Sequence, residues 1–349
     1  MRELTERQKF ILGLAVHEYI RTAAPVGSKS LVERYRLDCS PATVRNELAL
    51  LTEMQLLHQP HTSAGRVPTG DGYRLFVSRL MQTQELPEET RRMIEHQFSQ
   101  AQEGMDGWMK LAASVLAAQA NAVALVSAPM PTRKRLKHAA LVLITAKQVL
   151  MVLVLAGGQM QQRFLYVPQA TTQTRLDEIA QKINDLFSER TSEEIGATLK
   201  ERFISDPVTD ELLRSLQNTL NDTDSMESGE VYTDGINNVL SEPEFASSEE
   251  ARRNLRILDE KAKIREFLSQ STRDQNVGGL QVFIGGDGVL KKMKNCSLVI
   301  ARYGMQGVVT GTIGILGPMR MAYSKNIPTV RFLAGILSDL VADTNSEFC

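Results

Sequence analysis

The chain contains few cysteines. Its 349 residues include only Cys39, Cys296 and Cys349, which lie far apart and belong to no CxxC motif or histidine pairing. Isolated thiols of this kind are typical of reduced cysteines, and they exclude a disulfide framework or a zinc finger. The sequence therefore predicts a reducing compartment and a cytoplasmic protein.

Long apolar runs are also missing. The first ten residues, MRELTERQKF, contain no apolar segment of a signal peptide, and the longest apolar run covers only residues 149–156. A membrane-spanning helix needs about 20 apolar residues. We therefore expect a soluble protein with no membrane partner.

The chain as a whole has almost no net charge. It has 40 basic and 41 acidic residues, a balance of −1. Within residues 1–80, however, eleven lysines and arginines outnumber eight acidic residues, whereas residues 221–250 carry nine acidic residues and no basic one. If the protein binds a polyanion, its N-terminal part is the expected contact.

Catalytic and cofactor motifs are absent as well. No GxSxG or HExxH sequence occurs, and His17, His58, His96 and His138 lack metal-ligand spacing. The GGDG sequence at 285–288 lacks the GK[ST] ending of a phosphate-binding loop and the strand-to-helix context of a dinucleotide site, so we interpret it as a hairpin turn. The sequence thus predicts no enzyme, no metal and no cofactor.

Three closely spaced helices are predicted at the N-terminus. Thr5 and Gln8 have the spacing of a capping box at the start of the first. Ser28 is expected to cap the second, and Ser40, followed by Pro41, the third. This order of helix, turn and helix is typical of DNA-binding domains.

The third helix has a predicted inward face and a predicted outward face. The apolar residues recur at helical spacing and are expected to be buried: Val44, Leu48 and Leu51. The opposite side carries small and polar residues: Ala42, Arg45, Asn46 and Ala49. Arg45 can donate two hydrogen bonds to guanine, Asn46 can pair with adenine, and alanines allow close approach to a groove. Ser40 and Thr43, at the helix N-terminus, suit a phosphate oxygen. The alternative is an ordinary solvated helix face.

A short hairpin is predicted after this helix, with strands at 56–59 and 66–68. Its tip would carry His61, Thr62, Ser63 and Arg66 around the turn-forming Gly65. A small polar tip can lie against a sugar-phosphate backbone or enter a minor groove. Together with the helices, the hairpin predicts a winged helix-turn-helix. A fourth helix is expected to start at Thr69.

Both ends of the chain resemble the HrcA family of bacterial heat-inducible transcription repressors. The N-terminal likeness is carried by LTERQKFIL, EYIRTAAPVGSKSL, SPATVRNELALL and QPHTSAGRVPTGDGYRLFV, and the C-terminal likeness by CSLVIARYG, VVTGTIGILGPMRMAYSK and IPTVRFL. The resemblance implies a cytoplasmic homodimer that binds double-stranded operator DNA at an inverted repeat, called CIRCE, upstream of chaperone genes. It also implies that the GroEL chaperonin maintains the repressor's competence to bind.

The middle of the chain is interpreted as a sheet domain with an insertion. Four β-rich runs between residues 121 and 167 are joined by short turns, which predicts antiparallel pairing, and the β pattern resumes near residue 279. This arrangement resembles the GAF-like domain of the family. The expected domains are a winged-helix domain with a linker helix at 1–104, a discontinuous GAF-like domain at 105–189 and 263–349, and an inserted dimerisation domain at 190–262. The alternative for the insert is an acidic excursion of no defined role.

The sequence thus predicts an α+β fold and a negative regulator of class I heat-shock operons. The predicted DNA-binding residues are Ser40, Ala42, Thr43, Arg45, Asn46, His61, Thr62, Ser63 and Arg66. The alternatives are a small-molecule-sensing GAF-type transcription factor and a signalling module that does not bind DNA. Either would need a pocket with convergent polar groups in the core, and no sequence pattern indicates one.

Overall fold

The structure, a computed structural model, has an α+β fold in which helices cover antiparallel sheets. It describes residues 4–62, 64–81, 85–101, 104–131, 135–156, 160–200, 206–225, 229–246, 248–249, 255, 258, 260–272, 275–291 and 293–346. The chain divides into two compact units. The first comprises Met1–Ala128, Glu230–Gly304 and Gly311–Cys349, and the second Pro129–Gly229 with Met305–Thr310.

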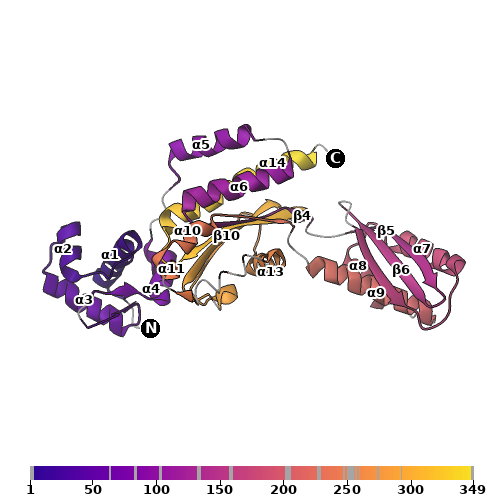
Figure 1. The fold of residues 1–349 in the computed structure, drawn as a ribbon, viewed down its shortest axis with the longest axis horizontal. Coiled ribbons are helices and arrows are strands. Elements are labelled where there is room, and N and C mark those ends of the chain that lie inside the picture. The colour runs from indigo at the N-terminus through magenta and orange to yellow at the C-terminus, as the bar shows by residue number, and fades with distance from the viewer. Residues whose placement is uncertain are drawn as a thin grey trace. The chain divides into compact units, whose positions relative to one another are not determined.

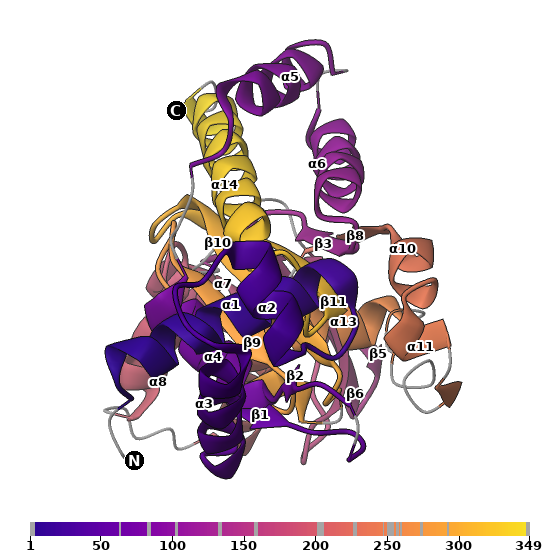
Figure 2. The ribbon, with the colours of Figure 1, turned by 90° about the vertical axis from the view of Figure 1, so that its left-hand side faces the viewer.

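The first unit begins with three helices, a hairpin and a fourth helix (Figures 1 and 2). In chain order these are α1 (Glu6–Thr22), α2 (Ser28–Tyr35), α3 (Pro41–Glu53), β1 (Leu57–His58), β2 (Val67–Pro68) and α4 (Gly70–Leu75). A π-helical turn, η1 (Phe76–Leu80), extends α4. The elements therefore follow the predicted order.

Side-chain caps set most of these helix starts. The capping box of Thr5 and Gln8 is confirmed, because each side chain accepts a hydrogen bond from the other's backbone N–H. Thr69 caps α4 through the backbone N–H of Gly72. The prediction for α2 was wrong by one residue: Gly27 precedes the helix, no side chain caps it, and Ser28 is its first residue.

The centre of the first unit is a sheet of six strands, five of which form one continuous path, here called the five-stranded sheet. Its strands follow the order β8 (Val231–Asp234), β3 (Val123–Ser127), β11 (Val309–Pro318), β10 (Cys296–Met305) and β9 (Leu280–Ile284). In Figure 1, α6 (Met105–Ala120) and α14 (Tyr323–Ser346) lie together over one face, and α13 (Lys261–Thr272) lies on the other. The shorter elements are α5 (Glu88–Ser99), α10 (Ile236–Leu240), α11 (Pro243–Ala246), β4 (Met130–Pro131), which pairs with the start of β11, and the 3-10 turn η3 (Gly288–Leu290).

The second unit is a three-stranded antiparallel sheet with helices on one face. Its strands are β5 (Leu136–Thr145), β6 (Gln148–Leu155) and β7 (Met160–Tyr166), and its helices α7 (Gln173–Phe187), α8 (Ser192–Lys200) and α9 (Pro207–Ser225). Alternate strand residues pack with these helices into one apolar core. The predicted antiparallel pairing is confirmed for β5, β6 and β7. It was wrong for the first of the four β-rich runs, because β3 pairs with β11 and β8 in the other sheet.

This unit is inserted between two neighbouring strands of the five-stranded sheet. The chain leaves the sheet after β3 and returns at β8, where the Ala128 N–H donates to the Glu230 carbonyl over 2.7 Å. The inserted unit therefore spans about the residues 129–229, whereas the sequence suggested 190–262. Short turns in a sequence indicate which strands pair locally, but they do not indicate to which sheet a hairpin belongs.

Candidate nucleic-acid interface

The N-terminus of α3 is an exposed, hydroxyl-lined helix end. The Ser40 Oγ accepts a hydrogen bond from the Thr43 backbone N–H over 3.1 Å and lies 3.0 Å from the Thr43 Oγ1. Pro41 occupies the first helical position, as predicted. Free backbone N–H groups and the positive end of the helix dipole favour an anion at such a site.

The predicted inward face of α3 is confirmed, and three of the four residues predicted to face outward are exposed, whereas Ala49 is half-buried. Val44 and Leu51 are fully buried and Leu48 is nearly so, whereas Ala42, Arg45 and Asn46 are exposed. Within the described part of the chain, the side chains of Arg45 and Asn46 form no hydrogen bond or ion pair. One guanidinium and one amide thus project together from a rigid helix, free to bind an external partner.

The predicted hairpin is present beside α3. Leu57 pairs with Pro68 and His58 with Val67 in antiparallel register. At the tip, His61 and Thr62 are exposed, and the Gln59 amide donates to the carbonyls of Thr62 and Ala64, at 2.8 and 3.0 Å. Ser63, also a predicted contact, lies outside the described residues. Gln59, which sequence reasoning did not single out, thus holds the tip in a closed turn.

Arg66 lies where the loop of the hairpin joins β2, and not at the tip of the loop. Its Nε donates to the Thr52 Oγ1 over 3.0 Å, and its backbone exchanges two hydrogen bonds of 2.8 Å with Val26. The preceding Gly65 approaches the α1–α2 turn so closely that a Cβ there would lie 2.5 Å from the Val26 carbonyl. Arg66 therefore connects the hairpin both to the last turn of α3 and to the turn before α2.

A buried carboxylate connects α1 to α2. Glu18 is 7% exposed. It accepts from Arg21 over 3.0 Å, lies 3.4 Å from Arg34, and accepts a 3.2 Å hydrogen bond from the Tyr35 hydroxyl. Burial, and then this hydrogen bond, raise the pKa of Tyr35 above its usual value. Sequence reasoning missed this cluster, although a glutamate on a buried helix face is the kind of residue that needs such partners.

A shallow depression among the described residues bears on the alternative of a small-molecule ligand. It measures about 450 Å³ and is lined by α6, the end of β8 and α10. Its polar groups are used by its own walls: the Asp234 carboxylate accepts from the Gly235 N–H, and the Asn238 amide donates to the Ala117 carbonyl. These groups do not converge on the depression as those of a ligand site do.

The described residues contain neither a metal site nor a membrane-spanning helix. Among them, no group of three or more His, Cys, Asp or Glu side chains could hold a metal ion. No helix in that part of the chain is long and apolar enough to cross a membrane.

Residues 106–327 match the family described as HrcA protein C terminal domain. Proteins named heat-inducible transcription repressor HrcA match nearly the whole chain. That of Roseiflexus sp. (strain RS-1) is 38% identical over 98% of this chain and 95% of its own length. The protein of Thermomicrobium roseum is 38% identical over 98% and 96%, and that of Carboxydothermus hydrogenoformans 35% identical over 98% and 99%.

A solved structure has a similar fold. It is titled as the crystal structure of a hypothetical protein at 2.2 Å resolution, and it aligns with a TM-score of 0.55 over 98% of both chains at 22% sequence identity. At that identity the likeness concerns the fold alone.

Proposed function

Because the chain belongs to the HrcA family of heat-inducible transcription repressors, which are not enzymes, we propose that it represses class I heat-shock operons as a homodimer bound to an inverted-repeat operator. The operator would be the CIRCE element upstream of chaperone genes. Two copies of the N-terminal segment would read its two arms, and the bound repressor would exclude RNA polymerase from the promoter.

The observation that carries this proposal is the outward face of α3. Arg45 and Asn46 are exposed and have no partner among the described side chains. Fixing either side chain without a partner costs conformational entropy. In our proposal residues 5–80 form a winged helix-turn-helix with α3 as the recognition helix in the major groove. Arg45 and Asn46 read base edges, and Ala42 lets the helix approach them.

The remaining contacts would hold the DNA backbone. Ser40 and Thr43 bind a phosphate at the α3 N-terminus, and His61, Thr62 and Ser63 place the wing against the backbone or in a minor groove. Arg66 acts chiefly as the brace between wing and recognition helix, since its Nε is bound to Thr52. The outer nitrogens of its guanidinium would add a phosphate contact.

An uncovered face of the inserted sheet supports the proposed dimer. Across β5, β6 and β7 the register aligns Val142, Leu150 and Phe164 in one row. On this face Phe164 is 61% exposed, and Ile144, Met160 and Tyr166 are 48%, 61% and 75% exposed. The helices pack on the opposite face. A contiguous apolar surface of this kind marks an interaction site, and a second copy placed on it by a two-fold axis matches the symmetry of an inverted repeat.

The rest of the proposal follows the family resemblance. The five-stranded sheet with α6, α14 and α13 would be the GAF-like domain, which carries the proposed winged helix-turn-helix of residues 5–80, the reading head. The protein would act in the cytoplasm, and GroEL would maintain the binding-competent population.

A footprinting experiment tests this proposal. Purified protein is incubated with a chaperone-operon promoter that contains the inverted repeat, and hydroxyl radicals map the protected backbone. We expect two protected blocks related by the dyad, and their loss for Arg45→Ala. Uniform protection along the fragment, or protection of one arm only, would contradict a dimeric operator reader.

A further inference from the structure

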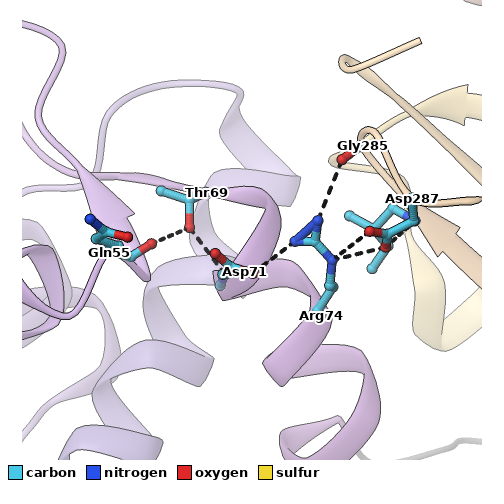
Figure 3. Close-up of polar contacts among 8 residues, drawn as sticks. Gln55, Thr69, Asp71, Arg74, Gly285 and Asp287 are labelled. Atoms are coloured by element: carbon cyan, nitrogen blue, oxygen red, sulfur yellow. Dashed lines mark hydrogen bonds and ion pairs between the residues drawn. The ribbon is translucent and has the colours of Figure 1, made fainter. Parts of the chain in front are cut away.

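The GGDG turn at 285–288, which the proposed function does not use, contacts Arg74 of the reading head. Figure 3 shows the contact: Arg74 extends from α4 and its Nε donates to both carboxylate oxygens of Asp287, at 2.8 and 3.1 Å. The Arg74 Nη2 approaches the Gly285 carbonyl at 3.5 Å. Both side chains are a little over one-third exposed. The contact lies entirely within the first compact unit.

The turn is shaped to present this carboxylate. Gly286 and Gly288 flank Asp287 with φ angles of +83° and +46°, which L residues rarely adopt. The Asp287 carboxylate also accepts from the Ile284 N–H over 3.3 Å, which orients it at the end of β9. The glycine pattern thus fixes an acidic side chain at the edge of the sheet.

On the other side, α4 is joined to the recognition helix. The Thr69 Oγ1 donates to the Gln55 carbonyl, directly after α3, over 2.6 Å, and it caps α4 at Gly72 (Figure 3). Asp71 accepts from the Arg74 Nη1 over 2.9 Å and holds the guanidinium in place. A continuous set of short contacts therefore runs from the end of α3 to Asp287.

The apolar side of the same contact contains a buried hydroxyl group, that of Tyr73. Tyr73 is buried beside Tyr323, with ring centroids 6.3 Å apart. Among the described residues its hydroxyl has no hydrogen-bond partner. A buried hydroxyl without a hydrogen-bond partner destabilises the packed arrangement. The ion pair of Arg74 with Asp287 therefore contributes a larger share of the free energy that holds the reading head on the sheet.

We propose that Arg74 and Asp287 are positioning residues for operator binding: their ion pair docks the reading head on the sheet domain and thereby fixes the separation and rotation of the two recognition helices in the dimer. This inference rests on the proposed function. It predicts that the ion pair determines which spacing between the two half-sites is bound with high affinity. The affinity for a single arm of the operator should not depend on the pair.

The test compares operators that differ only in the spacer between the arms. Changing the spacer by two base pairs rotates one arm by about 70° relative to the other. For the unmodified protein we expect this change to weaken binding about tenfold or more. Asp287→Asn should reduce that penalty to about threefold or less, and Arg74→Gln should do the same. The double variant should add nothing, because both substitutions break one ion pair.

Affinity for a duplex with a single arm is the decisive control, because Asp287 lies outside the reading head. It should be unchanged in Asp287→Asn. Glu260→Gln, which removes an acidic residue that lies just before α13 and pairs with Lys263 of that helix, should leave the spacing penalty intact. Amide hydrogen exchange should accelerate in α4 of Asp287→Asn and not in α3, which separates undocking from unfolding.

Two results overturn the inference. One is an unchanged spacing penalty in Asp287→Asn, and the other is an equal loss on single-arm and two-arm DNA. If the unmodified protein itself does not prefer two arms over one, the operator-binding proposal fails, which is a distinguishable outcome.

Discussion

At the scale of single residues, the outward side chains of α3 and the base of the hairpin differ in what surrounds them. Arg45 and Asn46 are exposed and unpartnered among the described residues, whereas Arg66 is tied to Thr52 and Val26. The first two can form new hydrogen bonds without breaking old ones. The Arg66 Nε is already bound to Thr52, so the contribution of Arg66 to DNA binding is expected to pass chiefly through the geometry of the hairpin.

Arg45→Ala and Asn46→Ala should each weaken operator binding by about 1–3 kcal/mol and relax the preference for one base pair, because each removes a base-edge contact. Titrations against operators substituted at single positions measure both effects. Arg92→Ala, which removes another exposed arginine, one that pairs with Glu88 within α5, serves as the control. Equal losses on operator and scrambled DNA would contradict direct readout.

Thr52→Val should lower the free energy of unfolding by about 1 kcal/mol, because the Arg66 Nε loses its acceptor. It should also weaken binding to all DNA sequences alike, and Arg66→Ala should have the same two effects. Urea unfolding with parallel DNA titration measures them. Thr344→Val removes a hydroxyl bonded only to the Leu340 carbonyl, and DNA binding should be unaffected in that variant.

At the scale of elements, the sequence was informative where structure is local. Thr5, Ser40 and Thr69 were identified as helix starts because a capping side chain and the backbone N–H that donates to it lie within three residues. The faces of α3 followed from helical spacing. The link from Arg66 to Thr52 and the pair of Arg74 with Asp287 could not be foreseen, since they join residues 14 and 213 positions apart.

Ser40→Ala should cost about 0.5–2 kcal/mol of stability through loss of the α3 cap, and it should also weaken DNA binding because a phosphate contact is lost. Thr172→Ala is the matched control, because Thr172 caps α7 in the inserted unit through the Arg175 N–H. That variant should lose stability and keep its affinity. Undiminished affinity in Ser40→Ala would remove Ser40 from the interface.

At the scale of the whole molecule, the chain combines an N-terminal group of helices with a hairpin, a five-stranded sheet with its helices, and an inserted unit. The insertion between β3 and β8 leaves the five-stranded sheet continuous, because these two strands are neighbours. It also adds a second sheet, one face of which exposes several apolar side chains. The sequence contained the strands of both sheets, but the choice between one sheet and two depends on long-range pairing that local patterns do not encode.

Phe164→Lys should convert the dimer to a monomer, because a charge would be buried in the proposed interface. Sedimentation velocity across a concentration series measures the change. Gln181→Lys places the same charge on an exposed position of α7, on the covered side of the sheet, and should leave the dimer intact. A dimer that persists in Phe164→Lys would place the two-fold axis elsewhere.

The central claim is that two copies of this chain read the two arms of one operator. The most direct measurement is a titration at several salt concentrations, with and without GroEL, of a duplex carrying the intact inverted repeat and of the same duplex with one arm scrambled. We expect a preference of about a thousandfold or more for the intact repeat. Equal and steeply salt-dependent binding to both duplexes would contradict the claim, because it would reduce the interface to nonspecific phosphate contacts.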